Sequence, residues 1–285
     1  MNKSTLKKIY LSFLIVLLAG GAEAQQPQLK NTDAVPAPVK VLAAGSLTGA
    51  MTAIAQLYTQ KTGQKIEAQF GPAGLLRERI ENGEQADIFA SANMEHPQAL
   101  ADKGLATQPV VLLRNRLCAK ALPDFELTQD NFLDRLLDPK TGLGTSTPKA
   151  DPGGDYTWMV FAKAEKLRPG AQAVLEAKAQ QLVGGKDSQP APNGQNAMEF
   201  AFDQKTVDIS VGYCSSRQTN ADPKYTTIVL PDALAVNANY GMSVVFRESK
   251  LQTAAYQFAL FLLSPEAQAL AAQYQFIPVN LPVEN

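Results

Sequence analysis

The stretch that decides the fold runs from residue 39 to residue 91 and reads VKVLAAGSLTGAMTAIAQLYTQKTGQKIEAQFGPAGLLRERIENGEQADIFAS. It begins with a short apolar run, Val39–Ala44, of the kind that forms a buried strand. Apolar residues at helical spacing follow in Leu47–Gln60. The order then repeats in three further elements: a strand at Lys65–Phe70, a helix at Leu75–Asn82 and a buried strand at Asp87–Ser91.

Small residues form the two turns that lead from strand to helix. Gly45 and Ser46 precede the first helix, and the run Gly71–Gly74 precedes the second. In a parallel sheet both helix N-termini point to the carboxyl edge of the strands, where unpaired amides and partial positive charge favour an anion. The pattern therefore predicts an anion site that includes the Ser46 hydroxyl. The alternative is that Ser46 only caps its helix, since serine is common at the N-cap position.

The runs Ala43–Thr48, Phe70–Gly74 and Ala86–Ala92 resemble the periplasmic molybdate-binding proteins of ABC importers, which have the type II periplasmic binding protein fold. The resemblance extends over nearly the whole mature chain and is strongest up to Ala92. It implies an α/β fold of two lobes, with mainly parallel sheets flanked by helices and a ligand cleft between the lobes. It also implies the capture of a small oxyanion, molybdate or tungstate, for a membrane permease, without catalysis and without a cofactor.

The alternation of strands and helices along the chain also favours an α/β fold with largely parallel sheets. Two segments, near Leu112 and Val229, are expected to cross between lobes. Lobe 1 is then predicted to contain residues 39–112 and 231–280, and lobe 2 residues 113–230. Ligands in such folds lie outside the carboxyl ends of the strands.

Residues 1–24 are predicted to be a signal peptide. Three lysines precede an apolar run, Ile9–Ala19, and the small residues of Ala22–Ala24 form a cleavage site. The apolar run is short for a bilayer span, so a membrane anchor is only the alternative. Because no cysteine lies near the cleavage point, we expect a protein free in the periplasm and not lipid-anchored. Residues 25–38 carry prolines among Gln, Asn and Asp, which predicts a disordered linker.

The charge balance excludes some classes of partner. The formal net charge is −1, and removing three lysines and one glutamate with residues 1–24 leaves about −3. With no basic run, nucleic acid and anionic membrane surfaces are poor partners. An anion would need a local site, since no overall positive field attracts it. We expect a monomer that interacts with its ligand and a permease.

The sequence contains two cysteines and one histidine, which could form a disulfide or hold a metal ion. Cys118 and Cys214 permit one disulfide in an exported protein, and their strand-like runs are neighbours in the proposed fold. Two buried thiols that behave as small hydrophobic residues are the alternative. His96 has no cysteine or carboxylate cluster beside it, so no metal site is predicted there. We expect His96 to be a surface or capping residue.

The resemblance implies four of the ligand contacts directly. Ser46 matches the serine of the first lobe. Ala73 falls where the family commonly has a second serine, so the backbone amide is kept and the hydroxyl is lost. Gly153 lies in the glycine loop of the second lobe and would donate its amide. Tyr213 matches the tyrosine whose phenol donates to the anion.

A fifth expected contact is ambiguous, and two departures from the family pattern leave the identity of the ligand open. Gln195 falls at another backbone donor by its distance before the tyrosine, although Asn196 could equally be that position. The hydroxyl missing at Ala73 costs roughly 1.5–3 kcal/mol if it met a charged acceptor, which is one to two powers of ten in affinity. Asp151 and Asp155 add negative charge near the predicted cleft. A different small anion, an organic ligand or a chelated metal is therefore the alternative cargo.

A secreted hydrolase is the alternative of a different class. Ser146–Lys149 spells S-x-x-K and Lys140–Gly142 spells K-T-G, but the order is reversed and S-D-N is missing. A triad based on His96 lacks the G-x-S-x-G elbow. Asp151 and Asp155 have no calcium-loop pattern around them, and we expect them to act as a turn residue and a helix cap.

Overall fold

The computed structural model describes residues 37–215, 224–246 and 251–279. The predicted signal peptide and most of the predicted linker lie outside these residues. The chain divides into the units Met1–Val35 and Pro36–Asn285, and the second contains everything described below. Within the described ranges, no helix is both long enough and apolar enough to cross a membrane.

The described strands form one nine-stranded mixed sheet in the order β2-β1-β3-β9-β4-β7-β5-β6, with β8 paired to β4. The strands are β1 (Val39–Ala44), β2 (Ile66–Gly71), β3 (Ile88–Ser91), β4 (Val110–Ala121), β5 (Leu143–Ser146), β6 (Ala179–Val183), β7 (Ile209–Tyr213), β8 (Thr226–Val229) and β9 (Asn237–Val244). The α-helices are α1 (Thr48–Thr62), α2 (Ala73–Glu81), α3 (Glu95–Asp102), α4 (Phe132–Leu137), α5 (Pro152–Leu167), α6 (Ala171–Lys178), α7 (Ala197–Asp203), α8 (Gln252–Leu262) and α9 (Pro265–Gln273). The predicted α/β class is confirmed.

Parallel pairing occupies both ends of the sheet. At one end β1 pairs with β2 and β3, and at the other β5 pairs with β6 and β7. The central pairs, β3 with β9 and β4 with β9, β7 and β8, are antiparallel. The parallel pairs follow from the alternation of strand and helix, because parallel neighbours need a crossover connection.

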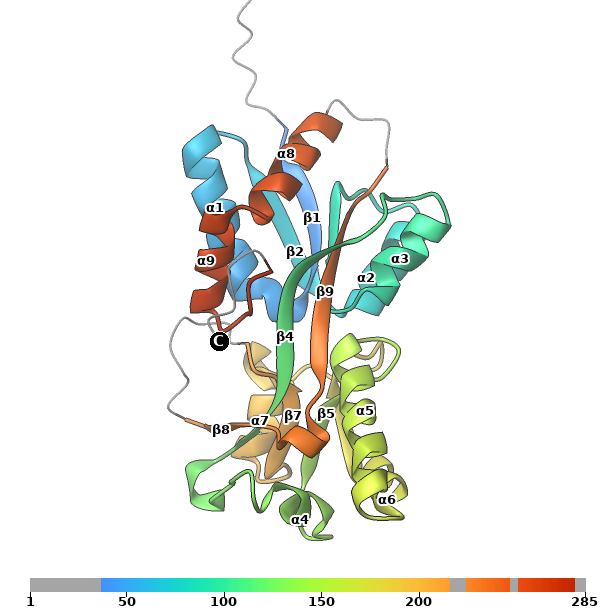
Figure 1. The fold of residues 1–285 in the computed structure, drawn as a ribbon, viewed down its shortest axis with the longest axis vertical. Helices are drawn as coiled ribbons and strands as arrows, with labels where there is room; N and C mark the ends of the chain where they lie inside the picture. The colour runs from blue at the N-terminus through green and yellow to red at the C-terminus, as the bar shows by residue number, and fades with distance from the viewer. Residues whose placement is uncertain (1–36, 216–223, 247–250, 280–285) are drawn as a thin grey trace, which may run out of the picture. The chain divides into compact units, whose positions relative to one another are not determined.

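The strand β4 belongs to both halves of the sheet. Residues 110–116 pair with β9, and residues 117–121 pair with β7 and β8. Figure 1 shows β4, in green, beside β9, in orange, down the middle of the fold. These two strands therefore join the two ends of the sheet.

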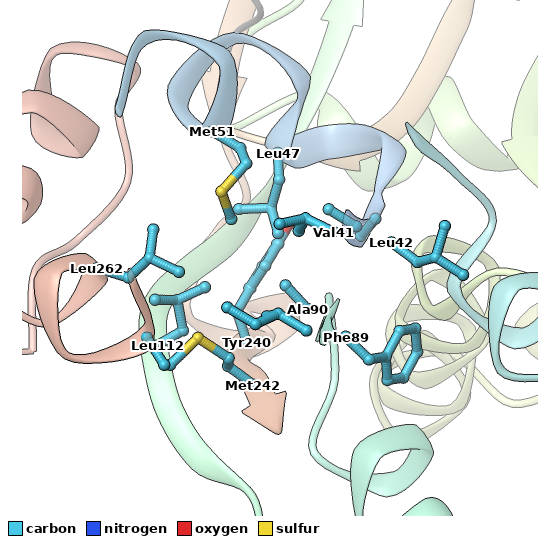
Figure 2. Close-up of a cluster of buried hydrophobic side chains, with 14 of the residues drawn as sticks. Val41, Leu42, Leu47, Met51, Phe89, Ala90, Leu112, Tyr240, Met242 and Leu262 are labelled. Carbon is cyan, nitrogen blue, oxygen red and sulfur yellow. The ribbon is translucent and has the colours of Figure 1, made fainter. Parts of the chain in front are cut away.

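Two large hydrophobic clusters lie on either side of this join. The first draws its buried residues from 39–113 and 238–276, and the second from 117–236. Figure 2 shows part of the first cluster, where Met51, Met242 and Leu262 gather around Tyr240. Tyr156 and Tyr213 pack against both clusters. The lobe boundaries given above remain a prediction.

The first helix shows why the local predictions succeed. Its apolar positions, Met51, Ile54 and Tyr58, are buried on one face, and Gly63 ends it with a φ of 74°. That left-handed conformation suits glycine at the end of a helix. The helix starts one residue later than predicted, because Gly45–Leu47 forms a 3₁₀ turn.

Candidate ligand-binding site

A cavity of about 500 Å³ lies where the turns after β1 and β2 meet the carboxyl end of β7, the start of α5 and the helix α7. It is lined by Gly45, Ser46, Thr48, Phe70, Gly71, Pro72, Cys118, Lys120, Ser146, Asp151, Gly153, Val183, Gly184, Asn196, Met198, Glu199, Phe202, Ser210, Val211, Gly212, Tyr213, Ser215 and Tyr225. Three of the predicted contacts, Ser46, Gly153 and Tyr213, therefore reach one cavity from three different segments.

Ser46 lies in the 3₁₀ turn and does not cap α1, for which the described structure has no side-chain cap. Its Oγ instead accepts a hydrogen bond of 2.8 Å from the Tyr240 hydroxyl. Figure 2 shows the Tyr240 side chain reaching from β9 toward Leu47, the neighbour of Ser46. The Tyr240 hydroxyl accepts a bond of 3.2 Å from Asn115 Nδ2, so its own proton goes to Ser46. Ser46 is thereby left with a proton to donate to a ligand.

Tyr213 ends β7 and lines the cavity, and its hydroxyl oxygen is buried. This hydroxyl has no hydrogen-bond partner among the described residues. The neighbouring Tyr240 hydroxyl accepts from Asn115 and donates to Ser46, and it keeps one acceptor lone pair. Burial holds the pKa of Tyr213 well above its usual value, so the phenol is a neutral donor. An unpartnered buried hydroxyl costs about 1–3 kcal/mol, which a ligand oxygen would relieve.

Gly153 reaches the cavity with its amide already engaged. Asp151 caps α5, and its Oδ1 accepts from the Gly153 amide at 3.2 Å while its Oδ2 accepts from the Ser146 hydroxyl at 2.5 Å. Burial raises the pKa of Asp151, and the negative charge of Asp155 acts in the same direction. The expectation that Asp151 caps a helix is confirmed. A carboxylate of the chain itself thus lies where the helix N-terminus was predicted to meet an anion.

Ala73 and Gln195 are not among the described residues that line the cavity, whereas their neighbours Pro72 and Asn196 are. Ala73 is buried as the first residue of α2. The Gln195 side chain donates to Asp203 at 2.8 Å. Asn196 caps α7 by accepting from the amide of the second helical residue, Met198, at 2.9 Å. Of the two positions left open by the sequence, Asn196 is the one at the cavity.

The predicted disulfide is present between Cys118 and Cys214. Its position follows from the pairing of β4 with β7, in which Cys118 lies opposite Gly212. Cys118 also lines the cavity. The alternative of two free thiols is therefore wrong.

The expectation for His96 is wrong. His96 lies in the first turn of α3 with only 7% of its surface exposed, and it is not among the described lining residues. Burial, with the positive charge of Arg77 nearby, lowers its pKa to about 4. The imidazole is therefore neutral at pH 7. In the part of the chain that the structure describes, no group of His, Cys, Asp and Glu could hold a metal ion.

Sequence reasoning missed the residues that support Ser46. Tyr240 and Asn115 lie in the interiors of β9 and β4, and no local motif marks them. They are brought to Ser46 by the pairing of those strands, in which Asn115 lies opposite Ala238. Asn115 is almost fully buried in the structure, but in the sequence it is only one polar residue within a strand, which does not reveal its partners.

Comparison with known proteins identifies the family. A model of the bacterial extracellular solute-binding proteins matches residues 39–277. The chain is 40% identical over 213 residues to an uncharacterized protein of Pasteurella multocida, covering 74% of this chain and 88% of that protein. It is 33% identical over 219 residues to the molybdate-binding protein ModA of Azotobacter vinelandii, covering 76% of this chain and 77% of that protein.

A solved structure shows the same fold. The periplasmic molybdate-binding protein of Azotobacter vinelandii superposes with a TM-score of 0.68 at 17% identity, covering 86% of this chain and all (100%) of that chain. The chain therefore belongs to the bacterial extracellular solute-binding protein family, in which its relatives include periplasmic molybdate-binding proteins.

Proposed function

We propose that the protein is the periplasmic component of an ABC importer and captures a small oxyanion, with molybdate or tungstate as its expected cargo. The observation that carries the proposal is the pair of hydroxyl donors at Ser46 and Tyr213. The first donates outward because its oxygen already accepts from Tyr240, and the second has no partner among the described residues. A fully ionised oxyanion only accepts hydrogen bonds, so neutral donors that line one cavity suit it.

The rest of the proposal follows the family. Export by cleavage of residues 1–24, a monomeric state and delivery to a membrane permease by closure of two lobes are parts of the proposal. The molybdate-binding relatives support molybdate as the first cargo to test. Contact of the ligand with Ala73, Gly153 and Gln195, or with Asn196 in place of the last, also remains a proposal.

We propose no catalytic role. The Ser146 hydroxyl donates to the Asp151 carboxylate, and His96 is not among the described lining residues. The base of a serine triad is a histidine, and the sequence contains one histidine, His96. The contacts of Ser146 are those of a residue that supports a helix cap.

The test is thermal unfolding of the exported protein with molybdate, tungstate, sulfate and phosphate. A ligand at a hundred times its dissociation constant adds about 2.7 kcal/mol, which corresponds to a rise of roughly 5–10 °C in melting temperature for a chain of this size. We expect the rise with molybdate and tungstate. If none of the four anions raises the melting temperature, the proposed cargo is wrong.

A matched pair of variants tests the site. Ser46→Ala removes a hydroxyl with a free proton and should weaken oxyanion binding by about one to two powers of ten. Thr48→Ala is the control, because the Thr48 hydroxyl also lines the cavity but donates its proton to the Gly45 carbonyl at 2.6 Å. Equal losses in both variants would contradict the assignment of Ser46.

A further inference from the structure

The cavity extends well beyond the two hydroxyl donors. Pairing of β4 with β7 places Cys118 opposite Gly212 and Lys120 opposite Ser210, so these four residues share one face of the sheet. All four line the cavity, and α7 contributes Met198 and Phe202 to its walls. Side chains alternate along a strand, so Tyr213 lies on the opposite face of β7 from Gly212 and Ser210, and the cavity borders both faces.

The glycine in this face leaves open space. A Cβ atom built on Gly212 meets no described atom within 4 Å, and its backbone needs no left-handed conformation. Protein interiors are close-packed, and a glycine inside a strand often marks the close approach of a ligand. Gly144 on the neighbouring β5 is different, because a Cβ there would lie 2.4 Å from the Met198 sulfur. Close packing against a neighbouring side chain therefore explains the glycine at position 144 but not the glycine at position 212.

The size of the cavity exceeds the needs of a bare oxyanion. Such an ion must have its oxygens within about 3 Å of the donors that hold it. An ion held by Ser46 and Tyr213 would therefore leave the space toward Lys120 unfilled. A volume of about 500 Å³ falls in the range of roughly 300–1,000 Å³ that small organic ligands occupy.

The walls of the extension suit a short carbon chain that carries hydroxyl groups. Met198 and the neighbouring rings of Phe202 and Tyr225, whose centroids are 5.0 Å apart, offer apolar surface. Asp151 lies beside Gly153 and Tyr213, and each of its oxygens accepts one hydrogen bond from the chain, which leaves acceptor capacity on both. A bare, fully ionised oxyanion has no donor for Asp151, whereas a hydroxyl group on a ligand does.

We propose that the cavity also binds oxyanions attached to a short hydroxylated carbon chain, with the oxyanion at Ser46 and Tyr213 and the chain over Gly212. This inference rests on the proposed function for the position of the oxyanion, and it extends the class of cargo from inorganic ions to small organic anions. The organic part would lie between α7 and the face of β4 and β7.

The experiment compares ligands with the same head group. Isothermal titration calorimetry of the exported protein measures inorganic phosphate, propyl phosphate and glycerol 3-phosphate, with molybdate alongside. We expect glycerol 3-phosphate to bind at least tenfold more tightly than inorganic phosphate. Propyl phosphate, which lacks the hydroxyl groups, should fall between them.

A substitution in the open space locates the organic part. Gly212→Val fills the gap with a side chain that strands accommodate well, and should weaken glycerol 3-phosphate binding at least tenfold. Phosphate and molybdate affinities should stay within about twofold of the unsubstituted protein. Gly212→Ala is the graded control and should have a smaller effect, and melting temperatures verify that both variants fold.

The outcomes separate the two proposals. If molybdate binds and glycerol 3-phosphate binds no more tightly than phosphate, the inference is overturned and the proposed function stands. If glycerol 3-phosphate binds tightly, is weakened by Gly212→Val and molybdate does not bind, the inference holds and the proposed cargo fails. Tight binding of glycerol 3-phosphate that is indifferent to Gly212→Val overturns the inference.

Discussion

Replacing Tyr213 by phenylalanine should change binding and stability in opposite directions. The hydroxyl that is lost is buried without a hydrogen bond to the described residues, and Tyr213 is one of the residues that line the cavity. The ring that remains keeps its contacts with Tyr240 and Tyr156, whose centroids lie 5.5 Å and 6.2 Å away. The substitution therefore removes one donor and almost no packing.

The magnitudes follow from the state of that hydroxyl. A hydrogen bond to a charged acceptor contributes about 1.5–3 kcal/mol, so the dissociation constant of an oxyanion should rise about 10- to 150-fold. A buried polar group without a partner costs about 1–3 kcal/mol. The free energy of unfolding of the unliganded variant should therefore stay the same or increase by up to that amount.

Two measurements and one matched variant check this prediction. Calorimetric titration gives the dissociation constant, and urea unfolding without ligand gives the stability. Tyr240→Phe is the control, because its hydroxyl makes two hydrogen bonds in a fully buried position. That variant should lose about 1–3 kcal/mol of stability. A comparable loss in Tyr213→Phe would refute the reasoning, and so would an unchanged affinity.

Three other predictions concern charge, covalent closure and packing. Because burial raises the pKa of Asp151, its negative charge is lost as the pH falls through a range above that of ordinary aspartate. Sulfate should therefore bind more tightly at lower pH. Asp151→Asn should remove this pH dependence and improve the sulfate affinity at pH 7 about tenfold. The same raised pKa means that the stability contributed by protonated Asp151 is lost as the pH rises. Urea unfolding from pH 4 to pH 7 should show this loss in the unsubstituted protein and not in Asp151→Asn. Reduction of the Cys118–Cys214 bond, which joins residues 96 positions apart, should lower the free energy of unfolding by roughly 4–5 kcal/mol in the chain-entropy view; a loss below 1 kcal/mol would contradict it. Gly74→Ala should lower the free energy of unfolding by about 1–3 kcal/mol, because a Cβ there would lie 2.7 Å from two carbonyl oxygens in residues 149–150. An unchanged melting temperature would contradict this prediction.

Local patterns predicted the first part of the fold closely. The periodicity of residues 39–91 gave β1, α1, β2, α2 and β3 within two residues of their observed bounds. Gly63 ends α1 in a left-handed conformation, which is a local requirement that glycine meets easily. The same local logic placed Ser46 in the turn after a strand, whereas Tyr213 came from the family resemblance, and both residues line the cavity.

The rest of the site depends on strand pairing between distant parts of the chain and on the exact residue at which each helix begins. Tyr240 is 194 residues from Ser46, and only the order of strands in the sheet brings the two hydroxyls together. Ala73 and Gln195 differ by one position from residues that line the cavity. A sequence motif identifies the segment that reaches the site. The exact residue at which the helix begins decides which side chain or amide faces the ligand. The engagement of the Gly153 amide by Asp151 is the helix cap expected from the sequence, and it competes with the ligand contact that the resemblance implied for the same amide.

The bond between Cys118 and Cys214 has a consequence for a molecule that a protease has cut. It closes residues 118–214 into a covalent ring that carries β5, β6, β7 and the helices from α4 to α7. A protease that cuts one peptide bond inside this ring opens the ring but releases no fragment. A nicked molecule would migrate as a single chain until it is reduced, and the cavity would keep every wall residue of the ring, including Gly212.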